Sequence, residues 1–366
     1  MTQQVLDQFR DQILNATQSK SLIRITGSGS KDWFGANLKG NTLSTKVYSG
    51  ILSYQPDELV ITVKAGTPLK EVEQALAEKN QQFSFEPPHF GENATIGGMV
   101  CAGLAGPGRV SAGGLRDFVL GAKIMDGQGQ ILSFGGTVMK NVAGYDVSRL
   151  LPGSLGTLAL LLDVSIKVLP KTAAHATLST QLTQAEAITL SNTLASQPWP
   201  INASAWVGEE MGTFYLRVSG AKAAVSSAIE SFSKNYGMVL LEEKNADVFW
   251  TSLREQNMEW FSHNPDQPLW RFALPSTCKP LNLPGSTLIE WHGGQRWWKG
   301  DISIQEAKSL AQSLGGHAGI HRFSKKTDEM LSSLKDNPLT AGLIPAQERL
   351  RKAFDPHGVF ATGRLI

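Results

Sequence analysis

Ile25-Thr-Gly-Ser-Gly-Ser-Lys31 is the first of three glycine-rich stretches on which the interpretation of this sequence rests. The second is Ala94-Thr-Ile-Gly-Gly98 and the third is Gly153-Ser-Leu-Gly-Thr157, and each adjoins an apolar, strand-like run. Glycine has no Cβ and tolerates positive φ, so such stretches expose backbone N–H groups to a large anionic ligand. Three of them in one half of the chain predict a site for an extended dinucleotide.

The first loop does not match the NAD-binding fingerprint of Rossmann domains, which needs G-x-G-x-x-G at the start of a helix. Gly27 and Gly29 are present, but Ser30-Lys31-Asp32-Trp33 supplies neither a third glycine nor an obvious helix. We expect the loop to wrap a pyrophosphate with successive N–H groups, helped by the hydroxyls of Ser28 and Ser30. A plain surface turn is the alternative, because glycine and serine dominate turns.

Composition limits the class of protein. With 366 residues the chain is long enough for two domains and a deep pocket. Its apolar content of 41% and charged content of 18% are those of a soluble globular protein. A net charge of +2 argues against a dedicated nucleic-acid-binding protein, which would carry a basic stripe.

Cysteine usage and hydropathy predict a cytoplasmic protein. Cys101 and Cys278 are the two cysteines, which suggests a reducing compartment and argues against an iron–sulfur cluster held by this chain. Residues 1–20 are amphipathic and predict a helix rather than a signal peptide. The most apolar run, residues 158–169, is interrupted by Asp163 and Lys167 and is too short to span a bilayer.

The order of elements predicts an α+β protein. Up to Pro170, strand-like runs alternate with helices, one of which is expected to have Thr67 as its cap and Pro68 at its first position. After a linker at 171–175, the pattern favours an antiparallel sheet with helices on one face. We expect a cofactor-binding domain over 1–170, a cap for substrate or subunit contact over 171–335, and a C-terminal tail over 336–366 that packs back on the first domain.

The order and spacing of residues 53–67 and the second and third loops resemble the flavin-binding domain of the vanillyl-alcohol oxidase and p-cresol methylhydroxylase superfamily. Three further motifs are similar to the FAD-binding E subunits of bacterial glycolate oxidases: Phe85-Glu-Pro-Pro-His89, Arg116-Asp-Phe-Val-Leu-Gly121 and Lys140-Asn-Val-Ala-Gly-Tyr-Asp146. The resemblance implies FAD as cofactor. It also implies a two-subdomain FAD-binding domain of the p-cresol methylhydroxylase type, with an α+β cap that contains an antiparallel sheet.

The resemblance also implies which residues lie near the cofactor. The pyrophosphate loop would comprise Gly27, Ser28, Gly29, Ser30 and Lys31, and the other side of the diphosphate and the ribityl chain would meet Thr95, Gly97 and Gly98. The remaining positions are Pro87 in its motif, Asp117 and Gly121 on a neighbouring strand, Asn141, Tyr145 and Asp146 on the isoalloxazine side, and Gly153, Gly156 and Leu160 near the flavin and adenine ends. For residues 141–146, a turn at a helix N-terminus capped by Asp146 is the alternative.

Departures from the family pattern concern covalent attachment and metal binding. The first loop has no histidine, so we expect FAD to be held non-covalently, with His89 and Cys101 in structural roles. The dehydrogenases of the superfamily share a histidine-rich metal motif followed by an acid. Here His317 and His321 are flanked by glycines and no acid follows closely, so no metal is expected. Ala361-Thr362 replaces the Asn-Pro that relatives show before Gly-Arg.

Oxidation of a 2-hydroxy acid needs a cation for the carboxylate and a base for the hydroxyl proton. His292 and Arg296, in the run Ile289–Trp298, have this chemistry and are the candidate catalytic residues. Arg271 is a further candidate cation. The alternative is that this run is an aromatic core strand of the cap, with Arg296 stacked on Trp297 or against another subunit.

The function implied by the resemblance is that of the FAD-binding subunit of a complex that oxidises glycolate to glyoxylate. Its partners would be a catalytic flavoprotein subunit and an iron–sulfur subunit that receives the electrons. The complex would place the chain peripherally on the inner face of the membrane. Two alternatives remain: a self-sufficient FAD-dependent 2-hydroxy-acid dehydrogenase, and a non-catalytic assembly subunit that has lost flavin.

Overall fold

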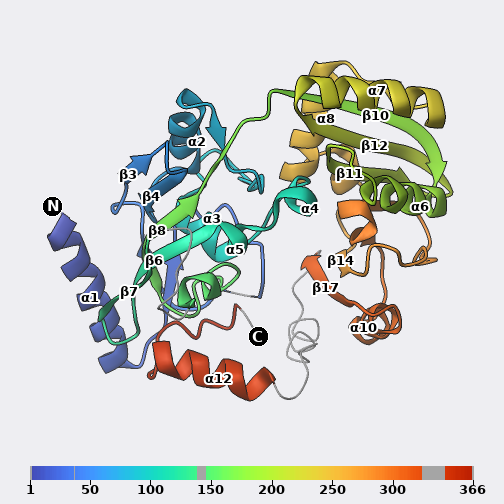
Figure 1. Ribbon diagram of the computed structural model, residues 1–366. Coiled ribbons are helices and arrows are strands. Elements are labelled where there is room, and N and C mark those ends of the chain that lie inside the picture. Colours follow the sequence, from blue (N-terminus) through green and yellow to red (C-terminus); the bar gives the residue numbers. More distant parts are fainter. Residues whose placement is uncertain (1, 37, 138–145, 324–342, 365–366) are drawn as a thin grey trace. The chain divides into compact units, whose positions relative to one another are not determined.

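The structure is a computed structural model that describes residues 2–36, 38–137, 146–323 and 343–364 (Figure 1). Tertiary contacts divide the chain into two compact units. Unit 1 comprises Met1–Leu104, Gly114–Pro170 and Leu334–Ile366, and unit 2 comprises Ala105–Gly113 and Lys171–Ser333. Within the described residues, no helix is both long and apolar enough to cross a bilayer.

Unit 1 is built around a five-stranded antiparallel sheet of strand order β3-β4-β8-β6-β7. Its strands are β1 (Ile23–Thr26), β2 (Asn41–Ser44), β3 (Ile51–Gln55), β4 (Val60–Lys64), β5 (Gln81–Gln82), β6 (Val119–Met125), β7 (Ile131–Gly135), β8 (Leu160–Lys167) and β9 (Leu169–Pro170). Its helices are α1 (Thr2–Ser19), α2 (Leu69–Glu78), α3 (Ile96–Ala102), α5 (Leu115–Phe118), η1 (Val147–Leu150) and α12 (Leu343–Phe354). The central strand β8 is buried on both faces except at Lys167, because its apolar run meets a packed layer on each side.

Local sequence explains the helix that follows β4. Leu69, Val72 and Leu76 recur at helical spacing and are fully buried, so α2 packs one apolar face on the sheet. The predicted cap is wrong by one residue. The helix begins at Leu69 with Pro68 as its N-cap, and the Thr67 hydroxyl instead donates to the Lys64 carbonyl at 2.7 Å.

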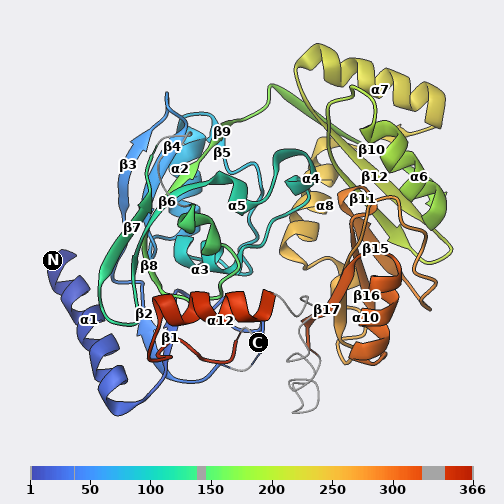
Figure 2. The same cartoon turned by 60° about the horizontal axis from the view of Figure 1, so that its bottom comes forward.

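The C-terminal segment belongs to unit 1 (Figure 2). After α12, the buried Asp355 carboxylate accepts from the Val359 N–H at 2.9 Å and the Phe360 N–H at 2.7 Å. The Ile23 N–H donates to the Val359 carbonyl at 2.8 Å, and Phe360 is fully buried in a core that also contains residues of α1 and β8. These contacts bring the last described residues beside β1 and the first glycine loop.

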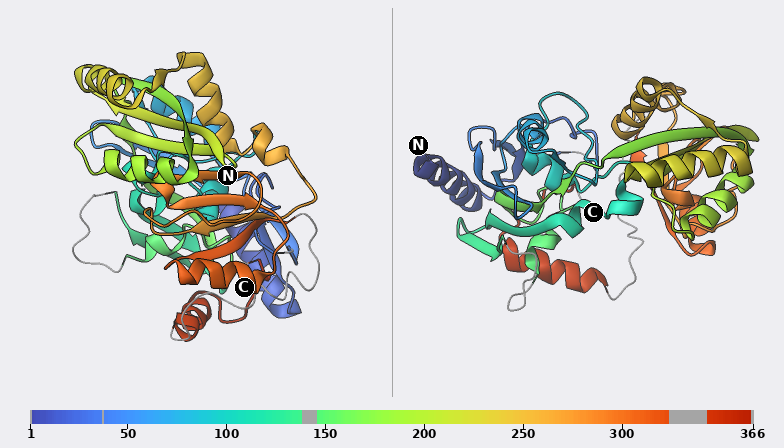
Figure 3. Two further views of the ribbon diagram at one scale, coloured as in Figure 1. Left: turned by 90° about the vertical axis from the view of Figure 1, so that its right-hand side faces the viewer. Right: turned by 45° about the horizontal axis from the view of Figure 1, so that its top comes forward.

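Unit 2 is an eight-stranded antiparallel sheet of order β13-β10-β12-β11-β15-β16-β14-β17 (Figure 3). Its strands are β10 (Ala174–Thr183), β11 (Ile201–Gly208), β12 (Met211–Gly220), β13 (Val239–Leu240), β14 (Leu269–Ala273), β15 (Thr287–Glu290), β16 (Gln295–Lys299) and β17 (His317–Arg322). Its helices are α4 (Arg109–Ala112), α6 (Gln184–Ala195), α7 (Lys222–Tyr236), α8 (Glu243–Glu255), α9 (Glu259–Ser262), η2 (Trp291–Gly293) and α10 (Ile304–Ser313). The mixture of helices and antiparallel sheets confirms the predicted α+β class.

Helices cover both faces of this sheet, so the expectation of helices on one face is wrong. Helices α6 and α7 pack on the face that includes Ile289, and α8 and α9 pack on the face that includes Trp297. The cause lies in consecutive apolar residues. Neighbouring side chains on a strand point to opposite faces, so Trp297 and Trp298 make both faces apolar.

The segment Ala105–Gly113 lies in unit 2, whereas the sequence-based boundary kept it within residues 1–170. Two hydrogen bonds hold it there. Trp291 Nε1 donates to the Gly106 carbonyl at 3.2 Å, and Asn202 Nδ2 donates to Ser111 Oγ at 3.1 Å. The functional division into cofactor domain, cap and tail stays a prediction.

Replacement of Gly66 by alanine is expected to destabilise unit 1. A Cβ at this position would lie 1.9 Å from the Thr45 carbonyl oxygen and 2.7 Å from that of Tyr48, and neither backbone group can move aside cheaply. We expect the free energy of unfolding to fall by about 1–3 kcal/mol, the usual consequence of overpacking. The control is Gly136→Ala, because a Cβ there meets nothing within 4 Å. Equal melting temperatures for the two variants would contradict the prediction.

Candidate cofactor-binding site

The three glycine loops meet at one pocket in unit 1. Nine of the residues predicted to bind the cofactor line this pocket: Gly27, Ser28, Gly29, Ser30, Lys31, Thr95, Gly97, Gly98 and Gly156. The lining also includes residues that sequence analysis did not assign to the site, among them Asp32, Thr45, Ala65, Cys101, Leu161 and Arg364. Five of these nine residues are glycines, so at these positions only the backbone can meet a ligand.

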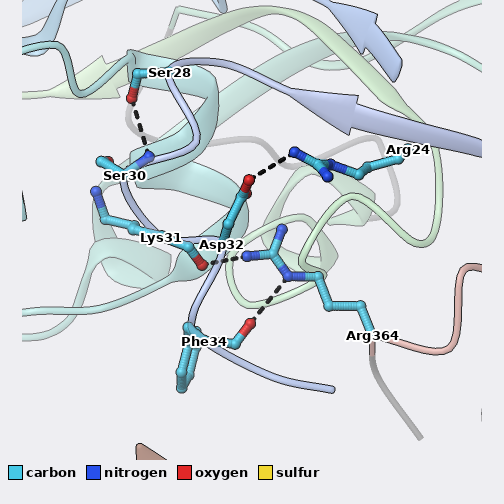
Figure 4. Close-up of polar contacts among 7 residues, drawn as sticks. All are labelled: Arg24, Ser28, Ser30, Lys31, Asp32, Phe34 and Arg364. Carbon is cyan, nitrogen blue, oxygen red and sulfur yellow. Dashed lines mark hydrogen bonds and ion pairs between the residues drawn. The ribbon is translucent and has the colours of Figure 1, made fainter. Parts of the chain in front are cut away.

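The first loop leaves β1 and offers free backbone donors. Among the described residues, the N–H groups of Ser28 and Gly29 donate to no protein acceptor. Gly29 has φ +80°, which a residue with a Cβ rarely adopts. The Ser30 N–H makes a long contact of 3.4 Å with Ser28 Oγ (Figure 4). Consecutive amides in such a turn form a concave site that suits an anion.

Two arginines hold this loop in place (Figure 4). Arg364, from the C-terminal segment, donates through Nε to the Phe34 carbonyl at 3.1 Å and through Nη2 to the Lys31 carbonyl. Arg24 forms an ion pair of 2.6 Å with Asp32. The Arg364 carbonyl in turn accepts from the Ala36 N–H at 3.2 Å. The loop is therefore anchored by a residue more than 300 positions away in the sequence.

The Lys31 side chain is committed within the protein. Its Nζ donates to the His89 carbonyl at 3.0 Å and lies over the Phe90 ring at 5.6 Å from the centroid. The residue is buried, so its ammonium adds positive charge beneath the loop rather than at the surface. His89 itself pairs with Glu73 at 3.0 Å, which agrees with the structural role expected for it.

The second loop packs closely on the first and on β4 because the glycines at these contacts have no side chain. A Cβ on Gly27 would lie 2.1 Å from Thr95 Oγ1, and a Cβ on Gly97 would lie 2.9 Å from Ala65 Cβ. Thr95 caps α3 by accepting from the Gly98 N–H at 3.2 Å, and the Gly97 N–H donates to the Ala65 carbonyl at 2.7 Å. In this loop the glycines chiefly allow close packing, because two of the amides expected at the diphosphate already have partners.

The third loop packs on the C-terminal half of α3. The Leu155 N–H donates to the Cys101 carbonyl at 2.8 Å, and the Gly156 N–H points to the Cys101 sulfur. Gly156 has φ +74° and lines the pocket, whereas Gly153 has φ +86° and does not. Burial raises the pKa of the Cys101 thiol, so this side chain stays neutral where the third loop packs on α3.

The other predicted cofactor residues that the structure describes do not line the pocket. Pro87 and Leu160 are buried in the interior, Asp117 caps α5 by accepting from the Gly114 N–H at 2.8 Å, and Asp146 pairs with Arg149 at 3.0 Å. Gly121 permits close approach of β6 and β7, because its Cβ would lie 2.6 Å from the Gly136 nitrogen. Asn141 and Tyr145 lie outside the described residues. The cofactor-binding roles of all these residues stay predictions.

The candidate catalytic residues lie in unit 2. Ser204 Oγ and His292 Nδ1 are hydrogen bonded at 2.8 Å, and burial lowers the pKa of His292 to about 4. Arg296 is fully buried and donates to the carbonyls of Gly293 at 3.1 Å, Cys278 at 2.5 Å and Lys279. These contacts hold the loop before β15 against the sheet. The catalytic role of the two residues stays a prediction.

The two histidines of β17, His317 and His321, lie on one face of the sheet. His321 contacts the Trp297 ring at 4.7 Å between centroids and is 3.1 Å from Gln256 Oε1. Within the part of the chain that the structure describes, no group of three or more histidine, cysteine, aspartate or glutamate side chains is arranged to hold a metal ion.

Comparisons with known proteins agree with a site for a flavin dinucleotide. The FAD binding domain family matches residues 6–147. The chain is 40% identical to glycolate oxidase subunit GlcE of Escherichia coli over 355 residues, which cover 97% of this chain and 95% of that protein. The similarity to D-lactate dehydrogenase of Archaeoglobus fulgidus is local, with 34% identity over 36% of this chain and 29% of that enzyme.

The fold is shared with more distant proteins. A solved structure of alkyldihydroxyacetonephosphate synthase superposes with a TM-score of 0.65 at 16% identity, covering 96% of this chain and 74% of that one. This likeness and the matched domain confirm the predicted fold, a two-subdomain FAD-binding domain with an α+β cap.

The pocket tests the fit of this cofactor independently. FAD carries a diphosphate, and the free amides of Ser28 and Gly29, with the buried Lys31 ammonium and the half-buried Arg364 guanidinium, match its charge. FAD is therefore the cofactor of this chain. By its similarity over nearly the full length of both chains, the protein belongs to the GlcE family of glycolate oxidase subunits, which are FAD-dependent oxidoreductases.

Proposed function

We propose that this chain is the FAD-binding subunit of a complex that oxidises glycolate to glyoxylate. The observation that carries the proposal is the 40% identity to GlcE across both units, whereas the similarity to the dehydrogenases covers about a third of the chain. The reaction removes a hydride from C2 of glycolate and a proton from its hydroxyl group. FAD supplies the two-electron acceptor for such a step when it is bound.

The proposed partners are a catalytic flavoprotein subunit and an iron–sulfur subunit that receives the electrons. A second subunit name, GlcD, is carried by a Bacillus subtilis relative that is 32% identical over 37% of this chain. Names of distinct subunits support a multi-subunit assembly. Unit 2 would contribute the substrate or subunit contact surface, and the complex would hold the chain at the inner face of the membrane.

We assign the roles within the FAD site as follows. The amides of Ser28 and Gly29 donate to the diphosphate, and Arg364 and Lys31 keep the loop in the receiving conformation. Gly27, Gly97 and Gly156 let the loops meet closely enough to line one pocket. FAD is held non-covalently. Asn141, Tyr145 and Asp146 are proposed to flank the isoalloxazine ring, and Gly153 and Leu160 to lie near the flavin and adenine ends.

Substitution of Arg364 is expected to weaken FAD binding. Arg364→Ala removes two charge-assisted hydrogen bonds to the loop, so we expect the dissociation constant of FAD to rise about tenfold to a hundredfold. Arg364→Lys keeps the charge but loses the forked geometry, so its dissociation constant should lie between those of the parent and of Arg364→Ala. Flavin fluorescence on titration of the apoprotein gives the constants. The control is Arg349→Ala on the exposed side of α12. Equal FAD dissociation constants for Arg364→Ala and Arg349→Ala would refute the role of Arg364 in holding the loop.

The contact between the first and second loops can be tested by a double substitution. Gly27→Ala places a Cβ 2.1 Å from Thr95 Oγ1, so we expect at least a tenfold loss of FAD affinity. In Gly27→Ala/Thr95→Ala the nearest remaining contact is the Thr95 Cβ position at 3.1 Å. The double variant should therefore lose less affinity than the sum of the single variants. Strict additivity would show that the two loops do not depend on this contact.

The proposed reaction is tested by the visible spectrum of the bound flavin. The purified chain should be yellow, and denaturation should release FAD into the supernatant because it is not covalently attached. Under anaerobic conditions glycolate should bleach the flavin when the partner subunits are present. Bleaching by glycolate with this chain alone would instead identify a self-sufficient dehydrogenase, and a colourless chain that takes up no FAD would identify an assembly subunit.

A further inference from the structure

Two arginines in unit 2 share one tryptophan ring. The guanidinium carbon of Arg109 lies 4.5 Å from the Trp291 ring centroid, and that of Arg271 lies 5.5 Å from it. Arg109 comes from the segment Ala105–Gly113 and Arg271 from β14. Neither forms an ion pair with a carboxylate among the residues that the structure describes. A ring face attracts each cation, but the like charges repel each other, so the arrangement favours an anion.

The electrostatics around Arg271 show an excess of positive charge. Burial and the nearby Arg109 lower the pKa of Arg271 to about 10, while Glu290 acts in the opposite direction. The Glu290 carboxylate already accepts from Gln295 Nε2 at 3.0 Å and Trp297 Nε1 at 2.5 Å. Burial and Arg271 together also lower the pKa of His317. The Glu290 carboxylate thus acts on Arg271 while it already accepts two hydrogen bonds.

The sheet leaves room beside Arg271. In the strand register Arg271 pairs with Gly319, and Ala273 pairs with His317, so Arg271 and His317 lie on one face of the sheet. A Cβ built on Gly319 would meet nothing within 4 Å. Arg271 Nε donates to Gln295 Oε1 at 2.6 Å, and its remaining N–H groups have no acceptor among the described residues. The terminal N–H groups of this half-buried guanidinium therefore remain available to a ligand.

The backbone beneath Trp291 is strained and firmly held. Trp291 has φ +54° and His292 has φ +57°, values that bulky residues rarely adopt. The Trp291 indole donates to the Gly106 carbonyl at 3.2 Å, and the His292 N–H donates to Ser204 Oγ at 3.0 Å. Backbone strain of this kind persists where the surroundings impose it, and it concentrates at binding sites. The contacts present both arginines in a preorganised geometry.

We propose that Arg109, Arg271 and Trp291 form a binding site for a small carboxylate of the 2-hydroxy- or 2-oxo-acid class. The carboxylate accepts two hydrogen bonds from the Arg271 fork, as guanidinium and carboxylate geometries match, and Arg109 adds the second positive charge. Binding of an anion follows from the observations above alone. The choice of a 2-hydroxy acid rests on the proposed function.

The experiment is calorimetric titration of the full-length, FAD-loaded chain with glycolate under anaerobic conditions. Ethylene glycol, which has the two-carbon skeleton without the carboxylate, and inorganic phosphate serve as comparison ligands. Arg271→Gln should raise the dissociation constant of glycolate at least tenfold, and Arg109→Gln should raise it several-fold. The matched control is Arg217→Gln, because Arg217 also lies over a tryptophan ring, Trp250 at 4.9 Å, and donates through Nε to one amide oxygen at 2.6 Å.

Glycolate binding that is weakened by these amounts in both arginine variants, retained in Arg217→Gln and absent for ethylene glycol supports the site. Equal glycolate affinity in the parent, Arg271→Gln and Arg109→Gln overturns it, as does tighter binding of phosphate than of glycolate at the same residues. Arg109 is exposed, so its variant decides the question if Arg271→Gln does not fold. If the arginines bind glycolate but the assembled complex never reduces its flavin with it, the proposed function fails and the site stands. If flavin reduction has the same glycolate dependence in Arg271→Gln, the site fails and the function stands.

Discussion

The cofactor site depends on one steric constraint, the direct contact between the backbone of the first glycine loop and the side chain of Thr95. Only the missing Cβ of Gly27 allows this approach, since a Cβ would lie 2.1 Å from the threonine hydroxyl. Thr95 also caps α3, and α3 carries Cys101, on which the third loop packs. This close contact therefore links the first loop to the helix on which the third loop packs.

The backbone amides of the site have two different roles, ligand binding and loop packing. The N–H groups of Ser28 and Gly29 remain available to a ligand. The Gly97 N–H instead donates to the Ala65 carbonyl, directly after β4, and the Gly98 N–H donates to the side chain of Thr95, which caps α3. The cations are also committed, because Lys31 and Arg364 donate to backbone carbonyls. Such preorganisation lowers the ordering that cofactor binding must impose. The diphosphate would meet a loop that is already in place.

Unit 2 shows a different use of aromatic residues. Consecutive tryptophans in β16 give the sheet two apolar faces, and helices cover each of them. Trp291, at the strained turn between β15 and β16, instead lies beside Arg109 and Arg271. Arg296 is fully buried and donates to three backbone carbonyls, one in this turn and two in the loop before β15, whereas Arg271 donates to a single acceptor, Gln295, among the described residues. The two arginines thus differ in what they can offer to a ligand.

The sequence by itself determined the local and compositional features. Apolar spacing predicts α2, the alternation of strands and helices up to Pro170 and the antiparallel sheet that follows, because these patterns follow the periods of 3.6 and 2 residues. Glycine content together with motif order indicated the three loops. The same local signals could not separate a glycine that donates its amide from one that only permits close approach, as Gly29 and Gly97 now illustrate.

Only the tertiary structure decided which distant residues complete each site. Arg364 reaches the first loop because Phe360 and Val359 anchor the C-terminal segment beside β1. The sequence indicated that the tail returns to the first domain, but not that Arg364 contacts this loop. The segment Ala105–Gly113 joins unit 2 through hydrogen bonds to Trp291 and Asn202, which brings Arg109 to Arg271. Contacts between residues so far apart in the sequence depend on how whole strands and helices pack. Sequence periodicity shows which face of a helix or strand is buried. Which other element packs against that face is decided by the tertiary structure.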